Sequence, residues 1–247
     1  MKNRLKEIIK KKKHEVQIKT LTAFPNIETE AVISVGSACR PAYWLKEYKL
    51  SPQALPFDWM MNYSFDTVID TIVNGVGKWF CHYEENAERR KVHRYVQDLD
   101  SGMVSMHHFS SDKKIAEQLN DFRTTFARRA QRLKDMLVAR RKICFVCNRK
   151  NKVEDFEEFL LKMGKLFKQN KFVLINIHDD ESKTSIYKYK INKRLTIYEV
   201  FGRDDRAGGN AEKNPKAWVG NKTLWRSVMS HIKLVEVAHK RRFWFWK

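Results

Sequence analysis

Cys39 is the residue of this 247-residue sequence whose type and position best suit chemistry. It follows residues 31–35 (AVISV), which predict a short buried strand, and it closes the small-residue turn 36–39. Pro41 fits the first turn of a helix that continues as AYWLKEY. A helix N-terminus lowers the pKa of a nearby thiol, and the backbone N–H groups of residues 37–40 could bind an oxyanion. The pattern predicts a nucleophilic cysteine, with a buried, inert cysteine as the alternative.

A nucleophilic thiol needs a base and a group that orients the base. His107 and His108 are the base candidates, and they follow residues 103–106, which can form a short strand. Adjacent side chains on an extended segment point in opposite directions, so we expect only one of the two to face Cys39. Asp58 lies between bulky apolar residues and is either a charged helix cap or a buried orienting group.

The sequence gives little reason to expect a metal ion or a cofactor. Cys144 and Cys147 have the spacing of metal ligands, but they fall inside a predicted strand and no second CxxC or HxxxH accompanies them. The chain has no GxGxxG or Walker motif, and Gly208 with Gly209 is an isolated pair. We therefore expect neither a metal nor a cofactor.

Substrate contacts are expected near Cys39 and at the end of a neighbouring strand. Asn148 and Arg149 follow the predicted strand 142–147, and open α/β sheets bind ligands at the carboxyl ends of their strands. Ser37, Arg40 and Trp59 complete the candidate set for substrate binding.

The elements that must position these residues alternate between helices and strands. The strand–helix–strand passage 142–177 is a βαβ unit and implies a parallel sheet, whereas segments 184–191 and 194–201 predict an antiparallel hairpin. We expect one α/β domain, a three-layer open sheet of Rossmann-like or SGNH-hydrolase-like type, mostly parallel, with an antiparallel hairpin extension. The expected helices span 64–80, 112–139, 153–169 and 223–233, and the expected buried strands span 31–35, 142–147 and 171–177.

The net charge of +20 is concentrated in three segments. Residues 1–20 carry +6, residues 123–152 carry +10 and the tail 240–247 carries +4, so the rest of the chain is neutral. We therefore divide the chain into a basic N-terminal segment 1–28, in which apolar residues of 4–18 follow helical spacing, a catalytic-type domain 29–238 and a basic–aromatic tail 239–247. A localised positive field indicates an anionic partner or surface.

Three partners match such a field: nucleic acid, an anionic membrane face, or an anionic small-molecule or glycan substrate. The tail KRRFWFWK joins interfacial aromatic residues to cations, as membrane-surface segments do, although a tail whose rings pack on the core is equally compatible, as is a solvated charge run for the N-terminal segment. Nucleic acid is less favoured, because no zinc-finger spacing, RNP-like strand or clear helix-turn-helix is present. The candidate membrane or anion surface comprises Arg128, Arg129, Arg132, Arg241, Arg242, Trp244 and Trp246.

The sequence lacks the signals of export or membrane insertion. No stretch approaches the roughly 20 apolar residues of a membrane span, the N-terminus has no apolar core of a secretory signal, and four cysteines are too few for a disulfide scaffold. We expect a cytoplasmic protein, attached peripherally to the inner membrane face if the tail binds lipid.

The segment ISVGSACRPAYWLKEYKLSPQALPFDWM, with the later MHHF and CFVCNR, resembles the bacterial family labelled "putative papain-like cysteine peptidase" (DUF1796). The resemblance implies that Cys39 is the nucleophile, His107 the base and Asp58 a candidate third member. The family's His-Asp-Phe stands here as His107, His108 and Phe109, so Asp58 must orient the histidine if the missing aspartate did so. The resemblance also implies a setting in bacterial surface polysaccharide biosynthesis.

The leading hypothesis is a cysteine-dependent hydrolase or acyltransferase. The alternatives are a glycosyltransferase-like or other sugar-modifying enzyme, which would bind a phosphate-bearing donor through arginines of 123–149, and a non-enzymatic nucleic-acid-binding protein. The substrate, the choice between hydrolysis and transfer, the choice between His107 and His108, and the oligomeric state stay open.

Overall fold

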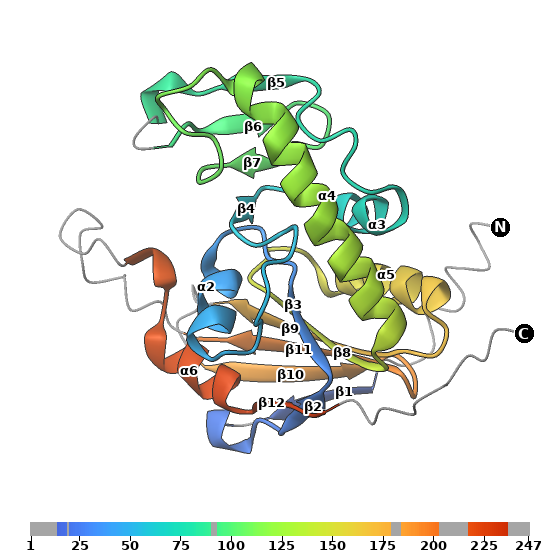
Figure 1. Ribbon diagram of the computed structural model, residues 1–247. Coiled ribbons are helices and arrows are strands. Elements are labelled where there is room, and N and C mark those ends of the chain that lie inside the picture. The colour runs from blue at the N-terminus through green and yellow to red at the C-terminus, as the bar shows by residue number, and fades with distance from the viewer. Residues whose placement is uncertain (1–13, 19, 90–92, 179–183, 203–216, 237–247) are drawn as a thin grey trace, which may run out of the picture.

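A six-stranded sheet forms the centre of the computed structural model, which describes residues 14–18, 20–89, 93–178, 184–202 and 217–236 (Figure 1). Four neighbouring strands run parallel: β3 (Ala31–Ser34), β8 (Lys142–Cys147), β9 (Lys171–His178) and β11 (Leu195–Phe201). The antiparallel strands β10 (Ser185–Lys190) and β1 (His14–Ile18) complete the far side. The sheet is thus mostly parallel with an antiparallel extension, as predicted.

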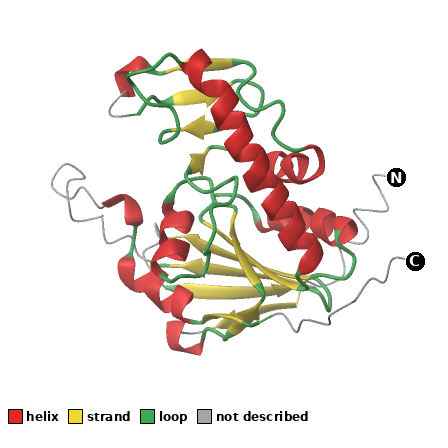
Figure 2. Ribbon diagram, viewed as in Figure 1, coloured by secondary structure: helices red, strands yellow, loops and turns green. Residues whose placement is uncertain are grey.

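Alternation along the central strands creates one apolar core on each face of the sheet. In β8, Ile143, Phe145 and Cys147 join one core, whereas Cys144 and Val146 join the other. Helices α3 (Phe65–Asn74), α4 (Ile115–Ala139) and α5 (Val153–Leu166) cover the first face, and α2 (Arg40–Glu47) and α6 (Lys222–Ser230) cover the second (Figure 2). The protein is therefore a three-layer α/β fold, as the sequence predicts.

The strand that carries the candidate nucleophile lies at an edge of the main sheet. The order β1-β10-β11-β9-β8-β3 leaves β3 with only β8 beside it. Parallel pairing brings the carboxyl ends of β3, β8, β9 and β11 to one side of the sheet, where their following loops gather. After β3 the chain leaves the main sheet, and it next enters this sheet at β8.

A second, four-stranded antiparallel sheet lies in the chain between β3 and α4 (Figure 1). Its strands, in order, are β4 (Met60–Met61), β7 (Val104–Ser105), β6 (Val96–Asp98) and β5 (Tyr83–Glu85). Only β7 was predicted, because runs of two or three residues show no periodicity. The shorter elements are the pair β2 (Ile27–Thr29) and β12 (Ile232–Leu234), and the 3-10 turns η1 (Leu21–Ala23), η2 (Ala87–Arg89) and η4 (Ala217–Val219).

Three expectations need correction. The helix expected over 223–233 ends at Ser230, and Ile232–Leu234 form the strand β12 instead. The helix expected to reach residue 80 ends at Asn74, because Gly75 follows with φ of 78°, a conformation that does not continue a helix. The helical spacing noted for residues 4–18 does not extend through 14–18, which pair with β10 as a strand. The main sheet therefore includes part of the basic segment 1–28. No helix in the described part of the chain is long and apolar enough to cross a bilayer.

Two glycines give a paired test of this description. A Cβ added at Gly164, inside α5, would lie 3.5 Å from Leu195, an ordinary contact. We expect Gly164→Ala to raise the free energy of unfolding by about 1 kcal/mol through helix propensity. Gly75→Ala should lower it by about 1 kcal/mol, because alanine is strained at positive φ. Urea denaturation measures both, and a destabilised Gly164→Ala variant would contradict the packing of α5 on β11.

Candidate active site

The structure brings Cys39 and His107 together from two different sheets. Cys39 ends the loop that follows β3 and is the N-cap of α2, and His107 follows β7 of the second sheet. The Cys39 Sγ lies 3.7 Å from the His107 Nε2, although 68 residues separate them. A thiol and an imidazole at this distance have the geometry that a nucleophile–base pair requires.

Close packing fixes the loop that carries Cys39. A Cβ at Gly36 would lie 2.5 Å from Pro41 Cγ and 2.8 Å from Asn148 Oδ1, so only glycine fits there. The backbone N–H of Asn62 donates to the Ser37 carbonyl at 3.1 Å and ties the loop to the second sheet. The Ser37 hydroxyl donates to the Asn148 carbonyl at 3.4 Å. Ser37 and Asn148 thus hold the loop.

The pKa of Cys39 is shifted opposite to the expectation from its place at a helix N-terminus. Burial raises the pKa of the thiol to about 11, and its own backbone N–H only partly offsets that rise. Desolvation outweighs the helix end here because the side chain is nearly covered and Pro41 contributes no N–H group. The thiol is therefore protonated at neutral pH.

The two adjacent histidines have different surroundings. Burial and the neighbouring His93 lower the pKa of His107, which is neutral at pH 7. The His108 Nδ1 lies 3.0 Å from the Ser105 hydroxyl, and its ring packs edge-on against Phe126 with centroids 5.0 Å apart. Burial lowers the pKa of His108 to about 3. His107 thus faces Cys39, whereas the half-buried His108 packs against Phe122 and Phe126 of α4.

Asp58 makes no hydrogen bond to His107 in the described structure. Its Oδ2 accepts from the Leu55 N–H at 2.8 Å, as in a local turn. Burial raises the pKa of Asp58 to about 6, partly offset by the Leu55 bond and by the positive charge of Arg129. The aspartate supports the loop before β4 and does not orient the imidazole by contact.

A pocket of about 480 Å³ opens beside the dyad. Two residues predicted to bind substrate, Arg40 and Trp59, line it, whereas Ser37, Asn148 and Arg149 do not. The Arg40 Nε donates to the Trp218 carbonyl at 2.8 Å. The described residues of the lining are Ala38, Cys39, Arg40, Trp59, Met61, Met106, His107 and Trp218.

Arg149 is a structural residue rather than a contact for substrate. Its guanidinium is buried, and it donates to the Val35 carbonyl and the Tyr63 carbonyl, each at 2.7 Å. It also stacks over Tyr63 and Phe65, 4.8 and 4.4 Å from the ring centroids. These bonds join the end of β3 to the segment that precedes α3.

Sequence reasoning missed four residues around the dyad: Met61, Met106, Trp218 and His93. Met61 and Met106 lie in and beside the short strands β4 and β7, which have no recognisable pattern. Trp218 reaches the pocket from η4, far along the chain. The His93 ring lies 6.4 Å from that of His107. The density of histidines in residues 82–108 was the one signal available for His93.

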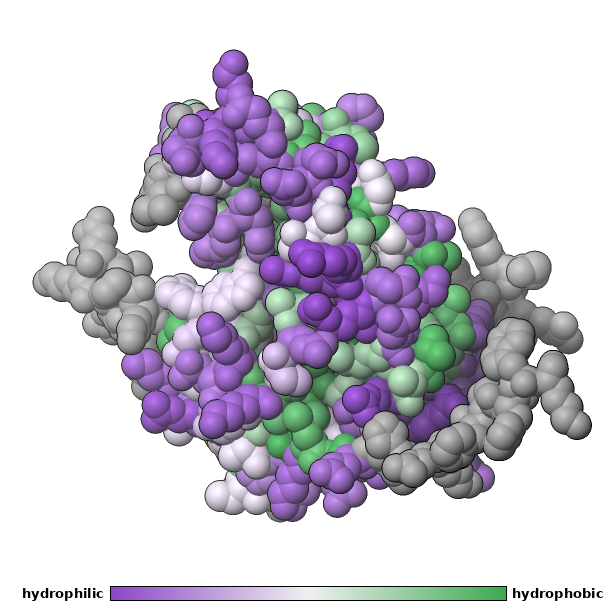
Figure 3. Space-filling view, viewed as in Figure 1, coloured by the Kyte–Doolittle hydropathy of each residue, from purple (hydrophilic) through white to green (hydrophobic). Residues whose placement is uncertain are grey.

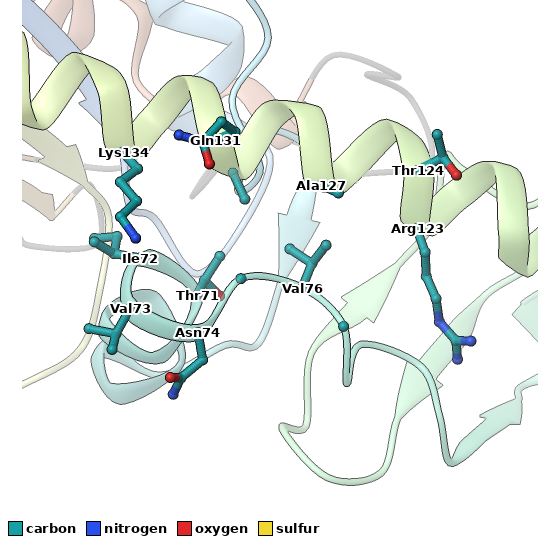
Figure 4. A pocket seen from close by; sticks show the side chains of 13 residues that line it. Thr71, Ile72, Val73, Asn74, Val76, Arg123, Thr124, Ala127, Gln131 and Lys134 are labelled. Carbon is teal, nitrogen blue, oxygen red and sulfur yellow. The ribbon is translucent and has the colours of Figure 1, made fainter.

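A second hollow, of about 530 Å³, lies between α3 and α4 (Figure 4). Its lining contains no cysteine or histidine, so it offers neither a nucleophile nor a base of the expected kind. Arg123, on its wall, donates to the carbonyls of Trp79 and Phe80, and Lys134 extends from α4 towards α3. Its larger volume therefore does not make it the reaction centre.

The basic residues of α4 are partly tied to the protein. Arg128 is exposed, and hydrophilic side chains cover the middle of this face over α4 (Figure 3). Arg129 is half-buried with its guanidinium over the Phe126 ring, and Arg132 donates to the Ala54 carbonyl. The predicted tail residues Arg241, Arg242, Trp244 and Trp246 lie outside the described residues.

No group of three or more His, Cys, Asp and Glu side chains is placed to hold a metal ion within the described ranges. Cys144 and Cys147 are buried in β8, and burial raises the pKa of both thiols. Their side chains face opposite cores, so they do not form a joint site.

The model of one protein family, described as "Putative papain-like cysteine peptidase (DUF1796)", matches residues 30–177. The match covers more than half of the chain and includes both Cys39 and His107, and the chain belongs to this family. It is also 20% identical over 221 residues to "Uncharacterized protein R408" of Acanthamoeba polyphaga mimivirus, covering 80% of this chain and 96% of that protein. No solved structure matches.

Arg149 provides the test of how the site is supported. We expect Arg149→Lys to lower the free energy of unfolding by about 3 kcal/mol, because lysine cannot keep both carbonyl bonds and the ring stacking. The matched control is Arg128→Lys on the exposed face of α4, for which we expect a change within about 0.5 kcal/mol. Chemical denaturation gives both values, and equal stabilities would remove the proposed support.

Proposed function

We propose that this member of the family is a cysteine hydrolase that works through an acyl-enzyme, with Cys39 as nucleophile and His107 as base. The observation that carries the proposal is the 3.7 Å contact between Sγ and Nε2 on the wall of an open pocket. The same chemistry allows transfer of the acyl group to an acceptor other than water.

The dyad acts from its neutral form. His107 is unprotonated at pH 7 and takes the thiol proton while Sγ forms a bond to the substrate carbonyl carbon. The imidazolium returns that proton to the leaving group as its bond to carbon breaks, which leaves a thioester on Cys39. Water then attacks the thioester with His107 again as base, and the acid and the free thiol are released.

The turn after β3 is the proposed oxyanion site. Backbone N–H groups of residues 37–40 lie at the N-terminal end of α2, where a helix favours negative charge. The closeness of Pro41 and Asn148 to Gly36 holds this turn in one conformation. A rigid set of donors stabilises a developing oxyanion without reorganising during the reaction.

The alternative of a sugar-modifying enzyme would draw on the seven arginines of residues 123–149. Three of them, Arg123, Arg132 and Arg149, donate to backbone carbonyls of the protein itself. These three are already engaged, whereas Arg128 and Arg141 are exposed, so this alternative also stays a prediction. An anionic partner or membrane surface for the tail, and a setting in surface polysaccharide biosynthesis, stay predictions.

The pH dependence of alkylation tests the neutral dyad. In a Cys81→Ser background, which removes the exposed thiol, we expect the rate of Cys39 alkylation by iodoacetamide to rise about tenfold per pH unit between pH 7 and 10. The sign follows from the raised pKa, since the thiolate fraction grows until pH reaches about 11. Peptide mass spectrometry follows the modified cysteine. A rate that is constant from pH 5 to 8 would indicate a thiolate–imidazolium pair instead.

Acylation by p-nitrophenyl acetate tests the roles of the residues. We expect Cys39→Ala to abolish the acyl-enzyme detected by intact mass, and His107→Asn to slow its formation at least about 100-fold, because general base catalysis is lost. Asp58→Asn should stay within about threefold of the parent protein, since its carboxylate contacts the Leu55 N–H and not His107. Acylation of Cys39→Ala to the same extent would refute the function, and a 100-fold loss in Asp58→Asn would restore a triad.

A further inference from the structure

The pocket beside the dyad is walled mainly by apolar side chains. Trp59, Met61, Met106 and Trp218 make up most of its surface, with Ala38 at the base of the nucleophile turn. Met61 and Met106 are half-buried, and methionine adapts its shape to irregular apolar groups. A volume of about 480 Å³ lies within the range of small-molecule sites, which is roughly 300–1,000 Å³.

The polar groups of the lining are few and already engaged. Cys39 and His107 contact one another, and Arg40 donates to the Trp218 carbonyl while its side chain is almost buried. A sugar would bring a hydroxyl on most ring carbons, and each buried hydroxyl needs a hydrogen-bond partner. Among its described residues, the lining has no aspartate, glutamate, asparagine or glutamine to supply one, and each of its two tryptophans offers a single indole N–H. The chemistry therefore favours an aliphatic chain over a glycan.

Trp59 is held in the pocket by an unusual backbone conformation. Its φ is 67°, in the left-handed region that bulky residues rarely adopt. Asn62, three residues later, also has positive φ, and its N–H is bonded to the Ser37 carbonyl. The segment that carries Trp59 is thus anchored to the turn that carries Cys39.

The strained conformation places the indole against the base. The rings of Trp59 and His107 meet edge-on with centroids 5.7 Å apart, and Trp59 lies 6.2 Å from the ring of Trp218. Backbone strain of this kind persists at functional sites when the side chain it places is needed there. Trp59 is positioned to limit the length of the pocket, and its contact with His107 restricts the movement of the imidazole.

We propose that this pocket holds the aliphatic chain of the acyl group carried by Cys39, and that Trp59 determines which chain lengths are accepted. This inference rests on the proposed acyl-enzyme, because the chain must be joined to the carbonyl that Sγ attacks. The tryptophan is a residue of specificity: it contacts the chain and contributes no proton or electron pair to the reaction.

The first test compares p-nitrophenyl acetate, butyrate, hexanoate and octanoate in the Cys81→Ser background. We expect kcat/KM to rise about fourfold per added methylene, because each buried methylene contributes about that factor, until the pocket is full. Trp59→Ala should flatten this dependence, and Trp59→Phe should keep most of it. Equal kcat/KM for acetate and octanoate, or an unchanged slope in Trp59→Ala, would overturn the assignment.

The Trp59→Gly variant distinguishes an effect on the pocket from an effect on folding. A binding experiment with Cys39→Ala distinguishes recognition of the aliphatic chain from the acylation reaction. Trp59→Gly should flatten the slope as Trp59→Ala does but melt at a higher temperature, because glycine accepts positive φ. Calorimetric titration of Cys39→Ala with octanamide should show tighter binding than with acetamide, and Trp59→Ala in that background should remove the difference. This binding needs no acyl-enzyme, so its presence without any acylation would refute only the proposed function. Tighter binding of maltose than of octanamide would refute the aliphatic pocket.

Discussion

The buried guanidinium of Arg149 is the interaction on which the geometry of the site depends. A charge removed from water needs hydrogen-bond acceptors, and arginine can reach several from one plane; Nε and Nη1 of Arg149 have them, whereas Nη2 has no hydrogen-bond partner among the described residues. Here the guanidinium joins the carbonyl of Val35, directly after β3, to the carbonyl of Tyr63 and stacks on two aromatic rings. Its backbone N–H is bonded to Asn176 of β9. One residue, through its side chain and its backbone N–H, therefore links the ends of β3, β8 and β9 to the start of α3.

The second sheet, which is inserted in the chain between β3 and β8, brings His107 to Cys39 at this edge of the main sheet. The sulfur comes from the end of an edge strand of the main sheet, and the imidazole comes from a sheet that the chain forms before returning to β8. The bond from Asn62 to Ser37 joins the two sheets next to the sulfur. The apolar core between the main sheet and helices α3, α4 and α5 continues into the second sheet through residues such as Phe57 and Phe109. The two reacting groups are thus held by a shared core rather than by a flexible linker.

Sequence patterns predicted the main sheet well and the second sheet poorly, for a physical reason. The strand 142–147 is a continuous apolar run between charged residues and was predicted with its observed bounds. Strands of two or three residues leave no alternation to detect, so β4, β5 and β6 and the pocket walls they support were missed. Cys39, His107, Arg40 and Trp59 could be selected from residue type and motif. The left-handed backbone of Trp59 and the separation of Asp58 from His107 depend on tertiary packing.

The direction of the Cys39 pKa shift shows how burial governs this site. A helix end alone would favour a thiolate, but the aromatic and thioether walls remove the water that would stabilise a charge. Partial desolvation and the neighbouring His93 lower the pKa of His107, so the thiol and the imidazole are both neutral at pH 7. In the proposed mechanism, charge develops only as Sγ attacks, when the substrate oxygen becomes an oxyanion beside the N-terminal end of α2. A thiol of this kind reacts slowly with general electrophiles, and its reactivity is confined to substrates that occupy the pocket and bring their carbonyl to the sulfur.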